Sequence, residues 1–138
     1  MIDILIKDEN NYNRKCLFDS DIIIDILKNN IHIIEFIKKL KSENSYFFYS
    51  PVSKAEVYSG AFINEIDNID LFFNQFSCIH ITDSIGKQAG LFLNKYRLSD
   101  NISLGDSLIA ATAYYYDLYL LTQNIRHYPM PEIRVIKP

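Results

Sequence analysis

The sequence predicts an α/β protein built on a central, mostly parallel sheet of four to five short strands. Short apolar runs alternate with longer segments whose apolar residues recur at helical spacing, a pattern typical of parallel strands joined by crossover helices. The runs are also apolar throughout, as expected of strands that are covered on both faces. The predicted strands span 16–18, 46–49, 78–81, 118–122 and 133–136.

Helices are predicted between these strands from their caps and their apolar spacing. Asp21 is a candidate N-cap for a helix that continues to Leu27. Ser53 and Glu56 have the spacing of a capping box, which would open a helix that ends at Gly60. Further helices are predicted over 33–40, 62–76, 82–96 and 106–116.

The length of 138 residues, with 49% hydrophobic residues, fits a single domain over 1–138. Residues 1–15 form an N-terminal extension of uncertain role, which contains a possible short edge strand at Ile2, Ile4 and Ile6. No signal peptide is recognisable, and no apolar run approaches the roughly 20 residues of a membrane span. We therefore expect a cytoplasmic protein with no membrane partner.

The two cysteines and the net charge exclude some classes of function. Cys16 and Cys78 belong to no CxxC pair or Cys/His cluster, so buried reduced thiols are expected and a zinc site is not. The net charge of −3 argues against a protein that holds nucleic acid by bulk positive charge. A nuclease stays possible, because an acidic metal site itself lowers the net charge.

Three acids and one amide fall where a parallel sheet forms its ligand sites, beyond the carboxyl ends of the strands. Asp19 follows the first strand, Glu56 lies in the first turn after the second, Asp106 opens a helix, and Asn124 follows the fourth strand. Clustered carboxylates suit Mg²⁺ or Mn²⁺, which can activate a water and stabilise charge during phosphodiester cleavage. Helix capping and the helix dipole explain the same acids without a metal, so the residues alone leave both readings open.

Four local strings, which together bracket residues 16–136, resemble the ordered motifs of the PIN domain family, and most closely those of VapC-like toxins. The strings are LFDSDIIIDIL at 17–27, SKAEVYSG at 53–60, GDSLIAATA at 105–113 and LLTQNIRHY at 120–128. The third string is the most specific of the four. The resemblance implies a three-layer PIN-like fold, with the sheet flanked by helices.

The resemblance also implies roles for individual residues. Asp19 and Asp106 would be the main Mg²⁺ (or Mn²⁺) ligands, and Asn124 would hold the fourth position. Glu56 would complete the acidic triad, either acting through a water or orienting one. Ser20 and Thr122 would support this site by hydrogen bonds.

Two residues depart from the family pattern. Asp21 stands where the motif usually has Asn, so it could bind metal or cap the helix, and capping is favoured. Asn124 stands where many members have Asp, which favours one tightly bound ion over two.

The implied function is a Mg²⁺-dependent endoribonuclease, the toxin of a toxin–antitoxin pair, with RNA as substrate and a cognate antitoxin and a second copy of the chain as partners. The alternatives are a non-catalytic PIN module that acts as a binding scaffold and a housekeeping RNA-processing nuclease. Several tyrosines could stack on bases or line a dimer interface, although an ordinary core or surface position is favoured for any single one of them. They include Tyr114, Tyr115, Tyr116 and Tyr119.

Overall fold

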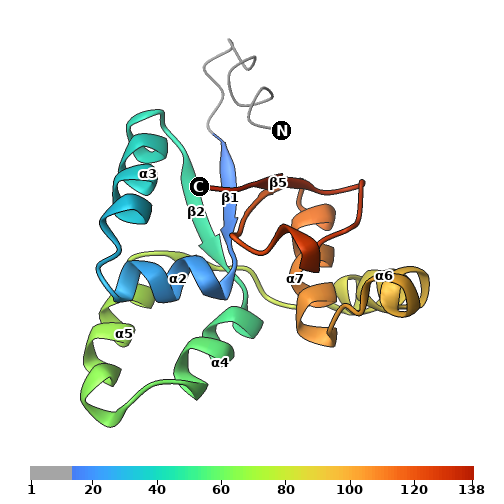
Figure 1. The fold of residues 1–138 in the computed structure, drawn as a ribbon, viewed down its shortest axis with the longest axis horizontal. Helices are drawn as coiled ribbons and strands as arrows, with labels where there is room; N and C mark the ends of the chain where they lie inside the picture. Colours follow the sequence, from blue (N-terminus) through green and yellow to red (C-terminus); the bar gives the residue numbers. More distant parts are fainter. Residues whose placement is uncertain (1–13) are drawn as a thin grey trace.

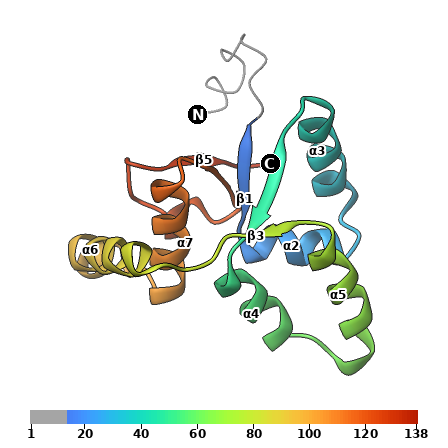
Figure 2. The same ribbon diagram turned by 180° about the vertical axis from the view of Figure 1, so that it is seen from behind.

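Five parallel strands form the centre of the fold in a computed structural model, which describes residues 14–138 (Figure 1). The strands are β1 (Lys15–Phe18), β2 (Tyr46–Tyr49), β3 (Ser77–Cys78), β4 (Tyr119–Leu121) and β5 (Arg134–Ile136). Their order in the sheet is β3-β2-β1-β4-β5, and each neighbouring pair is parallel. Figure 2 shows β3 beside the end of β2, where Cys78 pairs with Tyr49. The possible strand at Ile2, Ile4 and Ile6 lies outside the described residues.

Helices lie on both sides of this sheet, which confirms the predicted three-layer α/β fold (Figures 1 and 2). On one side lie α2 (Ser20–Leu27), α3 (Ile31–Ser42) and α5 (Ile66–Asn74), the last preceded by the 3₁₀ turn η1 (Ile63–Glu65). On the other side lie α6 (Asp83–Asp100) and α7 (Leu104–Tyr115). Helix α4 (Pro51–Ser59) contacts both α2 and α7, and a second 3₁₀ turn, η2 (Ile125–His127), lies between β4 and β5.

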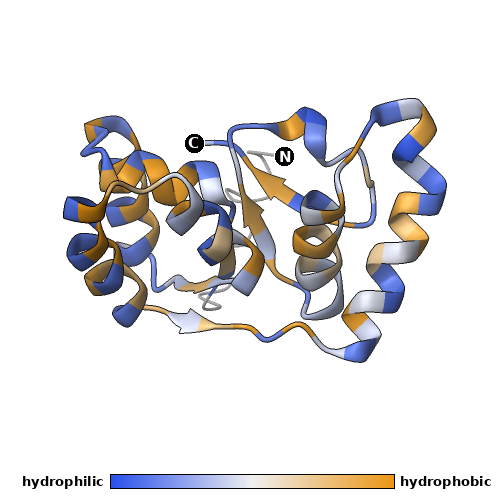
Figure 3. Ribbon diagram, turned by 90° about the horizontal axis from the view of Figure 1, so that it is seen from below, coloured by the Kyte–Doolittle hydropathy of each residue, from blue (hydrophilic) through white to orange (hydrophobic). Residues whose placement is uncertain are grey.

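The sheet separates two apolar cores, because successive side chains of a strand point to opposite faces. Phe18 packs on the α2–α5 side, where its ring stacks on Phe47 with centroids 5.2 Å apart. Leu17 packs on the other side with residues of α6 and α7. Figure 3 shows the matching pattern on the helices, whose hydrophobic and hydrophilic residues lie on different sides. Both faces of β1 and β4 are buried, as the continuous apolar runs predicted.

The prediction that both thiols are buried is confirmed for Cys16 only. Both cysteines are free, but Cys16 is buried whereas Cys78, on the edge strand β3, is partly exposed. In the described part of the chain, even the 18-residue helix α6 lacks the apolar length needed to cross a membrane.

Two predicted N-caps are wrong. Helix α2 is capped by Asp19, whose side chain accepts a hydrogen bond from the backbone N–H of Ser20, and not by Asp21. Helix α4 begins at Pro51 and is capped by Ser50, which accepts from the N–H of Val52 at 3.1 Å. Proline at the first helical position needs no N–H partner, so the helix starts before Ser53.

Other boundaries also differ from the prediction. Helix α7 begins at Leu104, so Asp106 is its third residue, paired with Ser103 in a capping box. The helix predicted over 62–76 is divided into η1 and α5, and the strand predicted over 78–81 is reduced to Ser77–Cys78. Helix α6 continues to Asp100, where Asn101 ends it with a φ of 53°.

Candidate active site

Asp19 lies at the carboxyl end of β1, where its backbone N–H donates to the carbonyl of Leu121 at 2.9 Å. Its carboxylate is buried and fully oriented by donors. Oδ2 accepts from the hydroxyl of Thr122 at 2.8 Å and from that of Tyr128 at 2.9 Å. Oδ1 accepts from the N–H of Ser20 at 2.8 Å. The pairing of β1 with β4 therefore holds this carboxylate at a fixed place on the carboxyl edge of the sheet.

Asp106 lies at the start of α7, on the same edge. Its N–H donates to the Ser103 hydroxyl at 3.0 Å, and its Oδ2 lies 3.4 Å from the N–H of Ser103. The same oxygen lies 3.6 Å from Nδ1 of His127. A carboxylate at a helix N-terminus is stabilised by the helix dipole, so this position is favourable for Asp106 with or without a metal.

Glu56 reaches the site from α4. Its Oε2 accepts from the hydroxyl of Ser20 at 3.3 Å. A Cβ built on Gly105 would lie 3.7 Å from Oε1 of Glu56, which places this carboxylate against the first turn of α7, beside Asp106. Ser53, which does not cap the helix, instead donates to the carbonyl of Phe18 at 3.4 Å and so ties α4 to the end of β1.

Asp21 anchors the loop that follows β4. Its Oδ2 accepts from the N–H of Gln123 at 2.8 Å and from Nδ2 of Asn124 at 3.3 Å. The side chain of Gln123 donates in turn to Oδ2 of Asp25 at 2.8 Å. The two positions that depart from the family pattern, Asp21 and Asn124, are thus in direct contact.

These carboxylates influence one another's protonation. Burial raises the pKa of Asp19 against the effect of its hydrogen bonds, and the charge of Asp106 raises it further. Burial, followed by the charge of Asp19, raises the pKa of Asp21 to about 6. Burial, with the charges of Asp19 and Asp106, also raises the pKa of Glu56. A cation among them would remove this conflict, because it stabilises the charged form of each acid.

The donor set fits a hard divalent ion. Each side-chain atom that could bind the ion is a carboxylate, hydroxyl or amide oxygen, the kind of ligand that Mg²⁺ and Mn²⁺ prefer. Mg²⁺ keeps several waters and needs only one or two protein carboxylates, which Asp19 and Asp106 could supply. Within residues 14–138, no three His, Cys, Asp or Glu side chains already form a ready ligand group.

The fold therefore brings Asp19, Glu56, Asp106 and Asn124 to one edge of the sheet, as predicted, while their catalytic and metal-binding roles stay predictions. Ser20 and Thr122 hydrogen-bond with these acids, and Asp21 lies beside them. The sequence prediction did not include His127 or Tyr128. Both follow Thr122 within the fourth motif, and their place in that motif is the feature of the sequence that could have identified them as site residues.

This edge of the sheet lies within a known domain. The sequence pattern of the PIN domain matches residues 16–132, so the chain belongs to the PIN domain family, and the resemblance seen in the four motifs is confirmed.

Among relatives, the chain is 35% identical over 117 residues to Ribonuclease VapC10 of Mycobacterium tuberculosis, which covers 84% of this chain and 87% of that protein. DNA-bound VapBC from Salmonella typhimurium has a similar structure, with a TM-score of 0.77, 20% identity and coverage of 90% of this chain and 98% of that chain. A toxin–antitoxin complex from Klebsiella pneumoniae gives a TM-score of 0.71 at 24% identity, with coverage of 88% and 95%. At these identities the two structures show a shared fold.

Proposed function

We propose that this protein is an endoribonuclease that depends on Mg²⁺ or Mn²⁺ and acts as the toxin of a toxin–antitoxin pair. The observation that carries the proposal is the convergence of Asp19, Glu56 and Asp106 at the carboxyl edge of a PIN-domain sheet. The similarity to Ribonuclease VapC10 supports RNA as the substrate. The raised pKa values of Asp19 and Glu56 support a site that is completed by a cation.

In this proposal Asp19 and Asp106 hold the divalent ion, which when bound lowers the pKa of a water and offsets charge on the phosphate. The bond of Ser20 to Oε2 of Glu56 leaves Oε1 to accept the proton of the attacking water. The water oxygen forms a bond to phosphorus as the bond to the 3′ oxygen breaks, and the 3′ oxygen takes up a proton from solvent. The products are a 5′-phosphate and a 3′-hydroxyl end. Asn124 holds the fourth position as a neutral group, and this favours one bound ion.

The test is an RNA cleavage assay with Mg²⁺ or Mn²⁺, with and without EDTA, with the ends of the products mapped by sequencing. Asp106→Asn and Asp19→Asn are expected to lose cleavage, because each removes a charged ligand. Asp67→Asn, on the exposed surface of α5, is the matched control and should retain it. Equal cleavage by Asp106→Asn and the wild type would refute the proposal, since the activity would then come from a contaminant.

Calorimetry separates the proposal from a non-catalytic scaffold. The nuclease is expected to bind Mn²⁺ at physiological concentrations, and Asp106→Asn is expected to weaken this binding. A wild-type chain that binds no divalent ion would instead favour the scaffold. The absence of any antitoxin gene beside its own would favour the housekeeping nuclease.

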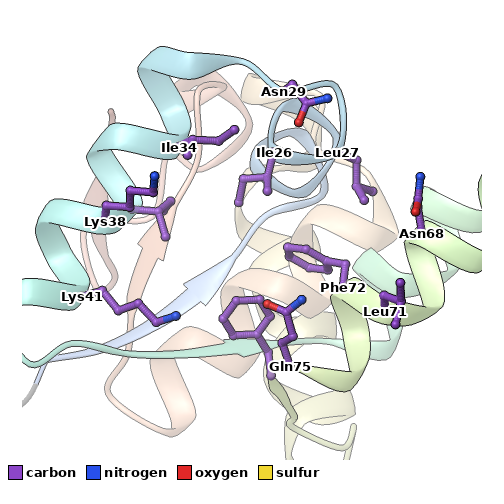
Figure 4. Close-up of a pocket in the computed structure, with 12 residues that line it drawn as sticks. Ile26, Leu27, Asn29, Ile34, Lys38, Lys41, Asn68, Leu71, Phe72 and Gln75 are labelled. Carbon is purple, nitrogen blue, oxygen red and sulfur yellow. The ribbon is translucent and has the colours of Figure 1, made fainter.

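A groove of about 410 Å³ between α2, α3 and α5 is the surface that we propose for the antitoxin. Ile26, Ile34 and Leu71 line it, and Lys38 and Lys41 extend from α3 along one side (Figure 4). An amphipathic helix with acidic residues beside its apolar face would match this surface. The fold shared with toxin–antitoxin complexes supports such a partner.

The antitoxin surface can be tested with a small protein encoded beside this chain's gene. Leu71, which is 61% exposed on α5, would be replaced by Asp, and the affinity for that protein would be measured. The expected loss is at least about tenfold, because a charge would enter the apolar contact. Ile63→Asp, in the turn η1 and 93% exposed, is the matched control and should bind as the wild type does, because Ile63 does not line the groove. Equal affinity of both variants would exclude this groove.

Formation of a homodimer is part of the same proposal. Leu91, Leu98 and Tyr115 are more than half exposed on α6 and α7 and offer an apolar surface for a second copy. Tyr119 is buried, so the expectation that it could stack on bases or line an interface is wrong for this tyrosine. Light scattering of the wild type and of Leu91→Asp tests the dimer, which the variant should weaken.

A further inference from the structure

Tyr128 is a buried residue at the site to which the proposed reaction assigns no task. It follows η2, and only 3% of its surface is exposed. Its hydroxyl donates to Oδ2 of Asp19 at 2.9 Å, a contact between residues that are 109 positions apart. A tyrosine hydroxyl that is buried in the core needs a hydrogen-bond partner, and the partner of this one is the carboxylate of a proposed metal ligand.

The hydrogen bonds of Asp19 limit how it can bind a metal. Each oxygen of a carboxylate has two lone-pair directions. On Oδ2 both are taken, by Thr122 at 2.8 Å and by Tyr128 at 2.9 Å. On Oδ1 one is taken, by the N–H of Ser20 at 2.8 Å, so the described part of the chain leaves one acceptor direction of the carboxylate open.

The packing of its ring holds the hydroxyl of Tyr128 against Asp19. The ring lies in the core together with Met130 and Leu120, which restricts movement of the hydroxyl away from Asp19. A metal that bound Oδ2 would have to displace a buried donor, which would then have no partner.

We infer that Tyr128 is a positioning residue that, together with Thr122, confines Asp19 to binding the divalent ion through Oδ1 alone. The inference rests on the proposed function. Binding through Oδ1 alone would make the site selective among divalent ions. Ca²⁺ readily takes both oxygens of a carboxylate, whereas Mg²⁺ requires a compact octahedral set of ligands. The hydroxyl of Tyr128 thereby disfavours Ca²⁺ relative to Mg²⁺ and Mn²⁺.

The test is calorimetric titration of the full chain with MnCl₂ and with CaCl₂, for the wild type and for Tyr128→Phe. Removal of the hydroxyl frees one direction on Oδ2, and the ratio of the Ca²⁺ to the Mn²⁺ association constant is expected to rise about tenfold, the change that follows from one hydrogen bond to a charged group. Tyr119→Phe, which removes the hydroxyl of another buried tyrosine, is the matched control and should leave the ratio as in the wild type.

Variants of Thr122 give a second, independent measurement. Thr122→Val removes the other donor to Oδ2 and should move the ratio in the same direction, whereas Thr122→Ser keeps the hydroxyl and should restore the wild-type ratio. Thermal unfolding of each variant checks that it is folded, and if Tyr128→Phe fails to fold, the Thr122 pair decides the question.

The possible failures are distinguishable. A wild-type chain that binds neither ion overturns the proposed function and this inference with it. A wild-type chain that binds Mn²⁺, with ratios in Tyr128→Phe and Thr122→Val that stay within twofold of its own, overturns this inference and leaves the proposed function intact.

Discussion

The two halves of the candidate site are held in different ways. On the β1–β4 half, Asp19 and Asp21 accept hydrogen bonds from four residues of the segment that follows β4. On the helical half, and among residues 14–138, Glu56 has a single bond, to Ser20, and Asp106 contacts the Ser103 of its own capping box and, at 3.6 Å, His127. The first half is therefore fixed by the pairing of strands, whereas the second depends on how α4 and α7 pack.

This contrast indicates a division of labour. A carboxylate fixed by several donors has little freedom, which suits a group that sets the place of an ion. A carboxylate with few bonds can contact water and substrate. Substitutions in the sheet half should therefore change stability. Those in the helical half should reduce cleavage, through ion binding at Asp106 and through the attacking water at Glu56, with little effect on folding.

Glu56→Gln should give the largest effect and act on the rate alone. The amide cannot accept the proton of the attacking water, so we expect cleavage to fall on the order of 100-fold. Stability should change by less than about 0.5 kcal/mol, because the side chain is partly exposed and makes one bond. Single-turnover cleavage and urea unfolding measure the two quantities. A loss of stability large enough to account for the lost rate would contradict the proposed difference between the two halves of the site.

Asp21→Asn should stabilise the metal-free protein at high pH. The folded pKa of Asp21, about 6, lies above its ordinary value of 3.8, so folding favours the protonated form. Stability linked to this group is fully present below pH 3.8 and is lost as the pH rises through 6. Neutralising the residue should therefore add about 2 kcal/mol at pH 8, with a gain that shrinks between pH 6 and pH 4.

Urea unfolding in EDTA at pH 8 and at pH 5 measures this gain, with the exposed Asp67→Asn as control. The same gain at both pH values would show that the charge of Asp21 is not its cause.

Asn124→Asp should have a smaller and opposite effect. It replaces the Nδ2 donor to Asp21 with a second carboxylate at the same place, so the metal-free protein should lose about 1 kcal/mol. The added charge should also create a second ion site, raising the Mn²⁺ stoichiometry from one to two in calorimetry. A stoichiometry of one in the variant would show that residue 124 does not decide the number of ions.

Gln123→Ala should have the smallest effect of the four. It removes the bond from Nε2 to Asp25 but keeps the backbone N–H that binds Asp21. We expect a loss of about 0.5–1 kcal/mol in urea unfolding and an unchanged affinity for Mn²⁺. A marked loss of ion binding would mean that the side chain, and not the backbone, holds this half of the site.

Sequence reasoning predicted the architecture well, because the apolar runs that form β1 and β4 are buried on both faces and do not fit a helical period. It placed the N-caps less well. Asp19, Asp21, Ser50 and Ser53 are all acceptable cap residues, and local preference does not distinguish them. Three features decide which of these residues cap the helices. They are Pro51 at the start of α4, the hydrogen bond from the N–H of Asp19 to Leu121, and the hydrogen bond from Ser53 to the carbonyl of Phe18.

By itself the sequence determined the α/β class, the order of the elements and the membership of Asp19, Glu56 and Asp106 in family motifs, because these depend on local periodicity and on short strings. Only the tertiary structure decided that Asp21 binds the loop after β4 and that Tyr128 binds Asp19. Both contacts join residues about a hundred positions apart, and they exist because the sheet order sets β4 directly beside β1. That order follows from how the crossover helices pack on the sheet, which no local pattern encodes.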